Sequence, residues 1–334
     1  MTPDSDHVGL QPPTFADIAD AARRLAGRAT ITPLHENAAL NETLGGRILV
    51  KCENLQRTGS FKFRGAYNFI SHLDDEAREI GVVSYSSGNH AQGVAAAARL
   101  MGVPALIVMP VDAPAIKLAN TRALGAEIRT YDRASESREE IAQGIAQERG
   151  AVILPPFDHP HTIAGQGTVG LELARQADEA GAKLDAVVCP CSGGGLVAGV
   201  ALALAELSPG TEVYAGEPAG FDDTARSLAA GERLANAAGA HSICDALLSP
   251  TPGRLTFAVN RRLLAGGVAV SDDDVRAAMA YGFRTLKLVA EPGGAAALAA
   301  ALCGKLDCRG RTVAVVLSGG NVDPWTFADA LDAR

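Results

Sequence analysis

The sequence predicts an α/β protein with two open, mostly parallel, twisted sheets, each flanked by helices. Short apolar segments of strand length alternate with longer alanine-rich segments of helical length along most of the 334 residues. The strand-like segments are apolar throughout, which is typical of parallel strands covered on both faces. The alternation falls into two regions, roughly 81–152 and from 155 onward, and each region predicts one sheet.

Eight segments have the continuous apolar character of buried strands. They are 47–53, 81–85, 105–109, 127–131, 151–154, 186–189, 212–215 and 312–317. The predicted helices between them are 89–101, 116–124, 135–149, 168–180 and 196–207. Ser271, followed by three aspartates, has the pattern of an N-cap and acidic first turn, and predicts a further helix.

Composition excludes several classes of partner. The formal net charge of −8 argues against nucleic acid or an anionic membrane as the main partner. The start of the chain has no basic, apolar signal pattern, and the longest apolar stretch, 295–303, is shorter than the about 20 residues that span a bilayer. None of the six cysteines forms a CxxC pair, so we expect reduced thiols and a cytoplasmic protein.

A lysine between two aromatic rings is the first candidate for chemistry. Lys62 lies between Phe61 and Phe63 in the segment 58–65, among glycines and small hydroxyls. Burial against aromatic rings lowers a lysine pKa, and a neutral lysine is a nucleophile for carbonyls. The alternatives are a lysine that extends its charge to solvent, or one held in an ion pair.

Polar loops follow several predicted strands, at the edge of a sheet where ligands bind. The glycines after Ser192 open a helix and could hold a phosphate on backbone amides. The same loop fits a dinucleotide fingerprint, with Glu217 as the ribose-binding acid, so from this loop alone an NAD-dependent oxidoreductase is equally favoured. Lys62, the phosphate loop and Ser318 at another strand end together favour a pyridoxal phosphate site.

With this combination the chain resembles the fold type II (tryptophan synthase β-like) pyridoxal phosphate enzymes, and within them the threonine/serine dehydratases and serine racemase. The resemblance runs from about residue 30 to Asp323. It rests on the segments 52–62, 87–93, 163–168, 193–195 and 317–323. The resemblance implies that the cofactor lies in a cleft between a large domain, 1–78 and 156–334, and a small mobile domain, 79–155. It also implies a homodimer.

The resemblance implies a role for each matching residue at the cofactor, pyridoxal 5'-phosphate. Lys62 would hold the cofactor covalently and remove the substrate α-proton, Phe61 would pack against the pyridine ring, and Asn89 would bond the ring hydroxyl. Glu291 would approach the cofactor edge, and Ser318 would face the pyridine nitrogen. The phosphate would be held by the backbone amides of Ser192, Gly193, Gly194, Gly195 and Leu196.

The same resemblance implies a small amino-acid substrate whose carboxylate lies near Ser86, Ser87 and His90. Ser318 is too weak an acid to protonate the pyridine nitrogen, so the ring is a weaker electron sink and β-elimination is favoured. The expected reaction is dehydration and deamination of L-serine or L-threonine to a 2-oxo acid and ammonia. Ser87, as acid/base on the second face, and Arg138, at the substrate carboxylate, also fit serine racemase or 3-hydroxyaspartate dehydratase. A pyridoxal phosphate-holding protein without turnover is a further alternative.

A divalent cation site is expected beside the phosphate loop. Glu217 and Asp223 are carboxylates six residues apart, and with the Phe221 carbonyl they would suit Mg²⁺, Ca²⁺ or Mn²⁺. The alternative is an acidic loop that caps the next helix. Two departures from the family pattern bear on which substrate the protein accepts. Ser192 occupies the first position of a loop that has four glycines in the family, and Ala246 stands in place of a glycine.

Overall fold

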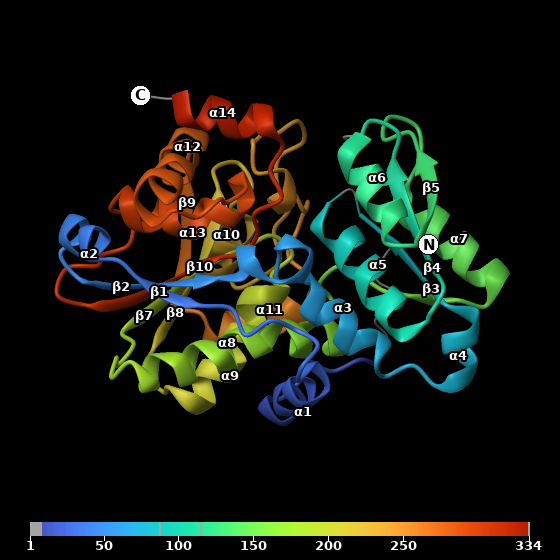
Figure 1. The fold of residues 1–334 in the computed structure, drawn as a ribbon, viewed down its shortest axis with the longest axis horizontal. Helices are drawn as coiled ribbons and strands as arrows, with labels where there is room; N and C mark the ends of the chain where they lie inside the picture. Colours follow the sequence, from blue (N-terminus) through green and yellow to red (C-terminus); the bar gives the residue numbers. More distant parts are fainter. Residues whose placement is uncertain (1–8, 87, 114, 333–334) are drawn as a thin grey trace.

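The computed structural model describes residues 9–86, 88–113 and 115–332 (Figure 1). Two sheets, each with its own helices, lie side by side, the larger on the left of Figure 1 and the smaller on the right. The predicted fold class is confirmed. Within the described ranges, no helix is both long enough and apolar enough to cross a membrane.

The larger sheet has six strands in the order β1-β2-β10-β7-β8-β9. Its strands are β1 (Leu34–Glu36), β2 (Arg47–Cys52), β7 (Ala186–Pro190), β8 (Glu212–Pro218), β9 (Gly266–Val270) and β10 (Thr312–Leu317). β1 is antiparallel to β2, and the remaining neighbours are parallel. The last strand in the sequence, β10, therefore lies inside the sheet between β2 and β7.

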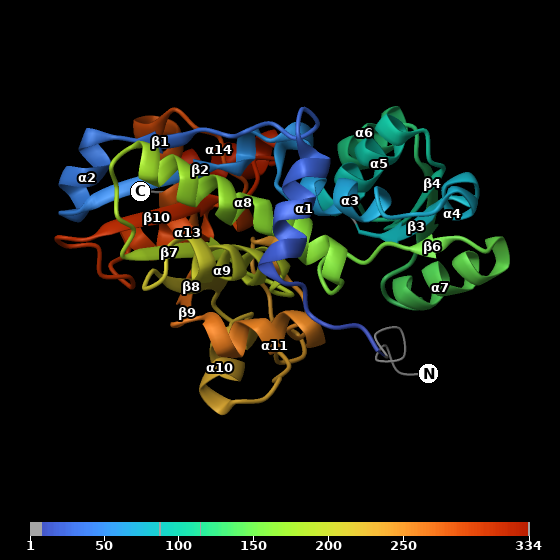
Figure 2. The ribbon, with the colours of Figure 1, turned by 90° about the horizontal axis from the view of Figure 1, so that it is seen from below.

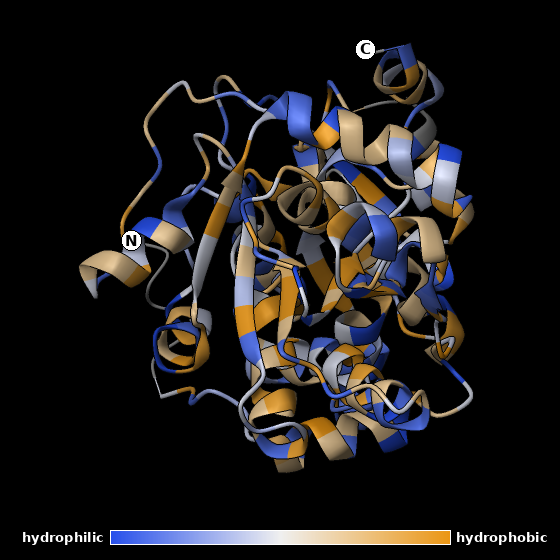
Figure 3. Ribbon diagram, turned by 90° about the vertical axis from the view of Figure 1, so that its left-hand side faces the viewer, coloured by the Kyte–Doolittle hydropathy of each residue, from blue (hydrophilic) through white to orange (hydrophobic). Residues whose placement is uncertain are grey.

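Side chains of the larger sheet alternate between two apolar layers. On β10, Val313 and Val315 point to a core formed with α12 (Asp272–Tyr281) and α13 (Pro292–Leu302). Ala314 points to the opposite core, formed with α8 (Pro160–Glu179) and α9 (Gly195–Leu207). Figure 2 shows α8 and α9 on the near face of this sheet, and Figure 3 shows hydrophobic residues recurring along its strands.

The smaller sheet is fully parallel, in the order β5-β4-β3-β6. Its strands are β3 (Val82–Tyr85), β4 (Ala105–Pro110), β5 (Glu127–Tyr131) and β6 (Val152–Ile153). Helix α5 (Asn89–Met101) covers one face and α7 (Arg138–Arg149) covers the other. Both faces are apolar, which accounts for strands without polar alternation.

The remaining α-helices surround this framework, except for α3, which is buried within it. They are α1 (Phe15–Leu25), α2 (Ala38–Leu44), α3 (Lys62–Ile70), α4 (Asp75–Ile80), α6 (Ala115–Ala123), α10 (Asp223–Ala230), α11 (Arg254–Leu263) and α14 (Pro324–Asp332). Helix α3 leads from the larger sheet toward the smaller one and packs on both α5 and α8. The division into a large and a small mobile domain stays a prediction.

Most predicted elements lie within a few residues of their observed bounds, with two corrections. The helix predicted over 168–180 begins eight residues earlier, at Pro160. The strand predicted over 212–215 extends to Pro218, so Glu217 lies within β8 rather than after it. The predicted cap is confirmed, because the Ser271 hydroxyl accepts the Asp274 N–H at 3.1 Å and the Asp274 carboxylate accepts the Ser271 N–H at 2.9 Å.

Candidate functional site

A cavity of about 340 Å³ lies between the carboxyl ends of the two sheets. The larger sheet and its helices contribute Lys62, the segment 192–196, Glu291 and Ser318. Elements of the smaller sheet contribute the loop after β3, α6 and the loop after β5. The structure thus brings together most of the residues to which the sequence assigned a role at a cofactor.

Lys62 is the first residue of α3, and its ammonium is enclosed by protein. Its Nζ donates a hydrogen bond to the Pro156 carbonyl at 2.7 Å and lies 5.2 Å from the centroid of the Phe61 ring. Burial lowers the pKa of Lys62 to about 8, against the opposing charge of Glu291. A substantial neutral fraction of Lys62 therefore exists near neutral pH, as nucleophilic or basic chemistry requires.

The loop between β7 and α9 has the geometry of an anion cradle. Gly194 has φ +89°, a left-handed conformation that favours glycine, and α9 begins at Gly195. The Gly193 carbonyl accepts hydrogen bonds from Gly253 N–H at 3.2 Å and Thr256 Oγ1 at 2.6 Å, which fixes the loop. Among the described residues, the N–H groups of Ser192, Gly193 and Gly194 donate no hydrogen bond. These N–H groups and the start of α9 suit a phosphate.

Ser192 and Leu196 complete this loop in different ways. The Ser192 hydroxyl accepts the Ser249 N–H at 3.1 Å, so the serine links the loop to the segment before α11. Leu196 is buried at the base of the cavity, where it lines the apolar wall. The serine in the first position of the loop is therefore compatible with the cradle.

A chain of side-chain amides connects the other edge of the cavity. Asn89 Nδ2 donates to the Glu291 carboxylate, and Asn321 Nδ2 donates to Asn89 Oδ1 at 2.7 Å. Burial, assisted by the charge of Asp245, raises the pKa of Glu291 to about 8. Glu291 is therefore mostly protonated at neutral pH. Ser318, at the end of β10, lines the cavity beside this chain.

Residues predicted to bind the substrate carboxylate surround the start of α5. The Ser86 hydroxyl accepts the Gly88 N–H at 3.2 Å and lines the cavity. His90 is buried with Nε2 3.3 Å from the Leu154 carbonyl, and burial, with the charge of Lys62, lowers its pKa to about 3. His90 is therefore neutral, and its Nε2 is turned toward a backbone carbonyl. The N–H groups at the start of α5 are then the better candidates for binding a carboxylate.

Two further predicted substrate residues differ in what the structure says of them. Ser87, the predicted acid/base on the second face, lies outside the described residues. Arg138 begins α7 and lines the cavity, with Nε donating to Glu139 at 2.8 Å and its guanidinium 5.5 Å from the Tyr85 ring centroid. Arg138 is therefore in a position to contact a bound ligand.

The predicted metal ligands gather at the start of α10. Glu217 accepts the N–H groups of Thr224 and Ala225 at 3.0 and 2.8 Å, so this carboxylate caps the helix. Asp223 Oδ1 accepts from Asn236 at 2.6 Å, whereas its buried Oδ2 lacks a hydrogen-bond partner. Burial raises the pKa of Glu217 to about 8 and that of Asp223 to about 6. In the described part of the chain, no group of three or more His, Cys, Asp or Glu side chains could hold a metal ion.

Several residues of the site had no assigned role in the sequence interpretation. Asn321 Nδ2 donates hydrogen bonds to Asn89 Oδ1 and to the Thr58 carbonyl. Thr58, which precedes Lys62 by four residues, has a left-handed φ of +61°. Lys117 and Arg133 reach the cavity from the smaller sheet. The polar Asn321 after a strand was a usable signal, whereas Lys117 and Arg133 lie in ordinary charged segments.

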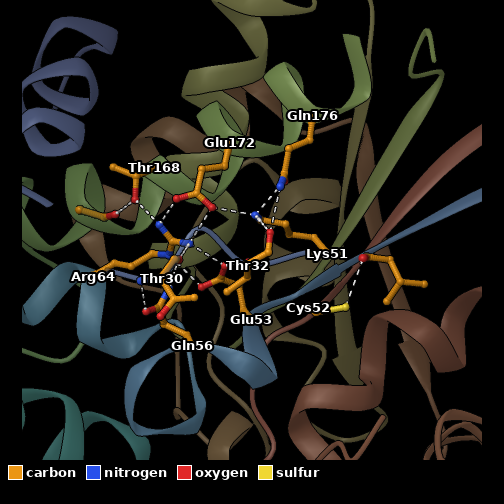
Figure 4. Close-up of polar contacts among 12 residues, drawn as sticks. Thr30, Thr32, Lys51, Cys52, Glu53, Gln56, Arg64, Thr168, Glu172 and Gln176 are labelled. Carbon is orange, nitrogen blue, oxygen red and sulfur yellow. Dashed lines mark hydrogen bonds and ion pairs between the residues drawn. The ribbon is translucent and has the colours of Figure 1, made fainter. Parts of the chain in front are cut away.

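A buried group of charges supports the start of α3 (Figure 4). This buried ion quartet consists of Lys51, Glu53, Arg64 and Glu172. Arg64 donates to both Glu53 oxygens at 2.8 Å and to the two Glu172 oxygens at 2.6 and 2.8 Å. Lys51 donates to Glu172 at 2.7 Å. The quartet is balanced in charge and fixes Arg64, two residues beyond Lys62, to β2 and α8.

Comparison with known proteins agrees with this site. A family model described as "Pyridoxal-phosphate dependent enzyme" matches residues 25–319. The chain is 41% identical over 322 residues to the L-threo-3-hydroxyaspartate ammonia-lyase of Saccharomyces cerevisiae, with 96% of this chain and 97% of that protein covered. It is 42% identical over 310 residues to the L-threonine ammonia-lyase of Thermotoga maritima, with 93% of this chain and 76% of the relative covered. The solved structure of maize serine racemase matches with a TM-score of 0.89 at 39% identity, covering 96% of this chain and 97% of that one.

Proposed function

Because the chain belongs to the pyridoxal-phosphate dependent enzymes, we propose that it is an ammonia-lyase acting on a small β-hydroxy amino acid. L-serine or L-threonine would lose water and then ammonia to give a 2-oxo acid. The observation that carries this proposal is the desolvated Lys62 ammonium in a cavity where the end of β10 presents the Ser318 hydroxyl and not a carboxylate. The resemblance to the family further leads us to propose a homodimer, and the six cysteines without a CxxC pair lead us to propose a cytoplasmic protein.

The residues of the cavity fit pyridoxal phosphate. Lys62 offers an amine of lowered pKa, Phe61 offers an aromatic face, and the loop before α9 offers N–H groups for a phosphate. When bound, the cofactor supplies an electron sink for the electron pair left at the substrate α-carbon. Asn89 and Glu291 form a polar edge beside Ser318, suited to the ring substituents of the cofactor.

The proposed roles of the protein residues follow from these positions. Neutral Lys62 accepts the α-proton at Nζ, and the start of α5 with Ser86 binds the α-carboxylate. The β-hydroxyl would take up one proton, which balances the α-proton accepted by Lys62, and leave as water; the unsaturated amine that is released would add water and give the 2-oxo acid and ammonia. Arg138 would orient the substrate by a charged hydrogen bond to its carboxylate region.

A second candidate substrate, 3-hydroxyaspartate, is supported by a specific observation. The side of the cavity formed by the smaller sheet presents three basic side chains, Lys117, Arg133 and Arg138. Serine and threonine carry one carboxylate, whereas 3-hydroxyaspartate carries two, and a relative named above acts on that diacid. Racemisation of serine depends on Ser87, which the structure does not describe.

A substrate panel tests the proposed function. The protein loaded with pyridoxal phosphate is incubated separately with L-serine, L-threonine and both diastereomers of 3-hydroxyaspartate. We expect ammonia and the matching 2-oxo acid in equal amounts from at least one of them. An inverted enantiomer without ammonia would instead identify a racemase, and a cofactor-loaded protein that turns over none of the panel would contradict the proposal.

We also propose that Mg²⁺, Ca²⁺ or Mn²⁺ binds Glu217, Asp223 and the Phe221 carbonyl. The buried Asp223 Oδ2 without a partner supports a cation, because an unpaired buried carboxylate oxygen is costly. The capping of α10 by Glu217 supports the alternative of a purely structural acidic loop.

Removal of divalent cations should therefore destabilise the protein. We expect a chelator to lower the Tm by about 5 °C and Mg²⁺ to restore it, because a ligand that binds only the folded state stabilises it. Asp223→Asn should abolish the response to both additions, whereas Asp222→Asn, one residue away, should retain it. A Tm that is insensitive to chelator in the unmodified protein would favour the acidic cap.

A further inference from the structure

Basic side chains are concentrated on one wall of the cavity. Lys117 comes from α6, Arg133 from the loop after β5, and Arg138 from the start of α7. These three elements belong to the smaller sheet, whereas the proposed phosphate cradle belongs to the larger one. One substrate carboxylate and one cofactor phosphate leave part of this positive charge without a ligand.

Two of the three cations are held by neighbours. Lys117 Nζ donates to Asp245 at 2.7 Å, across the cavity, and its side chain is only 13% exposed. Arg138 pairs with Glu139 and lies over the Tyr85 ring. Both positive charges are therefore engaged by partners that line or border the cavity.

Arg133 is held more weakly than the other two. Its Nε donates to Asp112 at 2.8 Å, and the two side chains are 49% and 63% exposed. An ion pair between half-exposed side chains contributes about 0–1 kcal/mol. Within the ranges described, the terminal amino groups of Arg133 make no hydrogen bond. They are the part of a guanidinium that binds a carboxylate with two parallel hydrogen bonds.

The topology places Arg133 at a suitable distance from the proposed α-carboxylate site. Asp112 follows β4 and Arg133 follows β5, while Ser86 follows β3, and β4 pairs with both other strands. The strand register puts Ser86 level with Thr130, three residues before Arg133, so the two backbones are separated by two strand spacings, about 10 Å, across the sheet and by up to about 10 Å along it. An arginine side chain on one side and a four-carbon diacid on the other can span this separation.

We propose that Arg133 binds the side-chain carboxylate of a dicarboxylic β-hydroxy amino acid and so directs the enzyme toward 3-hydroxyaspartate. This inference rests on the proposed ammonia-lyase activity. The substrate carboxylate replaces Asp112 as the partner of Arg133, and Lys117 stays paired with Asp245. Serine and threonine lack the second carboxylate, so Arg133 does not strengthen their binding.

Kinetics of Arg133 variants with two substrates test this assignment. For Arg133→Met, we expect the ratio of kcat/KM for 3-hydroxyaspartate to that for serine to fall about 30-fold, mainly through KM for the diacid. Arg133→Lys should restore part of the ratio. Asp112→Asn, which releases Arg133, should raise the ratio. Succinate, titrated calorimetrically into the cofactor-loaded protein, should bind the unmodified protein and lose at least about tenfold affinity in Arg133→Met.

The outcomes separate this inference from the proposed function. If the unmodified enzyme turns over none of the substrate panel, the ammonia-lyase proposal fails. If it turns over both, and Arg133→Met lowers both kcat/KM values equally or leaves succinate binding unchanged, Arg133 is not the carboxylate receptor and the inference is overturned.

Discussion

Replacing Lys62 by alanine is expected to lower ammonia release about 10⁴-fold, the upper range for loss of a general base. Lys62 lines the cavity together with the phosphate loop and Ser318, and its Nζ donates only to a backbone carbonyl among the described residues, whereas Lys117, the other lysine of the lining, is paired with Asp245. The pKa of Lys62 of about 8 also predicts how the rate depends on pH. The neutral base is the active form, so kcat/KM, which reports the pKa values of the free enzyme, should fall about tenfold for each pH unit below 8. The measurement is a coupled assay of the 2-oxo acid between pH 6 and 9.

Two matched variants make this experiment specific. Lys62→Arg keeps the positive charge but cannot become neutral, so it should be as inactive as Lys62→Ala. Lys305→Ala removes a half-exposed lysine away from the cavity and should leave the rate unchanged. In both Lys62 variants, the visible absorbance band of the bound cofactor should be shifted from its position in the parent. In Lys305→Ala, the band should stay at the parent's position. Substantial turnover by Lys62→Ala would refute the assigned role.

Replacing Arg64 by methionine is expected to lower the free energy of unfolding by about 3–5 kcal/mol, the cost of leaving a buried charge unpaired. Arg64 is 1% exposed and its partner Glu53 is fully buried. Removing the guanidinium leaves Glu53 with Thr32 and the more distant Lys51, and Glu172 with Lys51 alone. Urea denaturation, followed by circular dichroism, measures the loss.

The control and the pH dependence both follow from the geometry of the quartet. Thr168→Val removes the 3.2 Å hydrogen bond from Arg64 and the 2.7 Å hydrogen bond that the Thr168 hydroxyl donates to the Gly165 carbonyl, while the ion pairs stay, and should cost about 1–2 kcal/mol. Burial raises the pKa of Glu53, but Arg64, Lys51 and Thr32 together lower it below the ordinary value. A carboxylate with a lowered pKa stabilises the fold above its unfolded pKa and loses this contribution as the pH falls through its folded pKa. The difference between parent and Arg64→Met should therefore shrink below about pH 4. A difference under about 1 kcal/mol at pH 7 would contradict the prediction.

The residues that we propose for the chemistry could be singled out from the sequence because each lies in a short local pattern. Lys62 lies between two phenylalanines, and the glycines after Ser192 join a strand to a helix. Parallel strands bring their carboxyl ends to one edge, so these patterns could be placed together without coordinates. Ser318 follows for the same reason from its place after β10.

Features that depend on distant partners were not predictable in this way. Arg64 and Glu172 are 108 residues apart, and neither segment indicates the other. The first two turns of α8 contain Gly165, which lowers helix propensity by about 1 kcal/mol, so the sequence favours a later start. The structure explains this glycine, because a Cβ there would lie 2.5 Å from the Arg64 carbonyl. Close packing of α8 on α3 therefore overrides local propensity.

The interior position of β10 has a consequence for how the protein is made. The smaller sheet is complete once β6 has left the ribosome, whereas the larger sheet needs β10 to join β2 to β7. About 160 residues, or roughly 10–30 s of synthesis, separate these two events. During that interval the edge of β2 that will pair with β10 has no partner strand, and the site at the start of α3 is incomplete. The smaller sheet can therefore form first, whereas the apolar strands β2 and β7 stay without their common neighbour until β10, the last strand, is made.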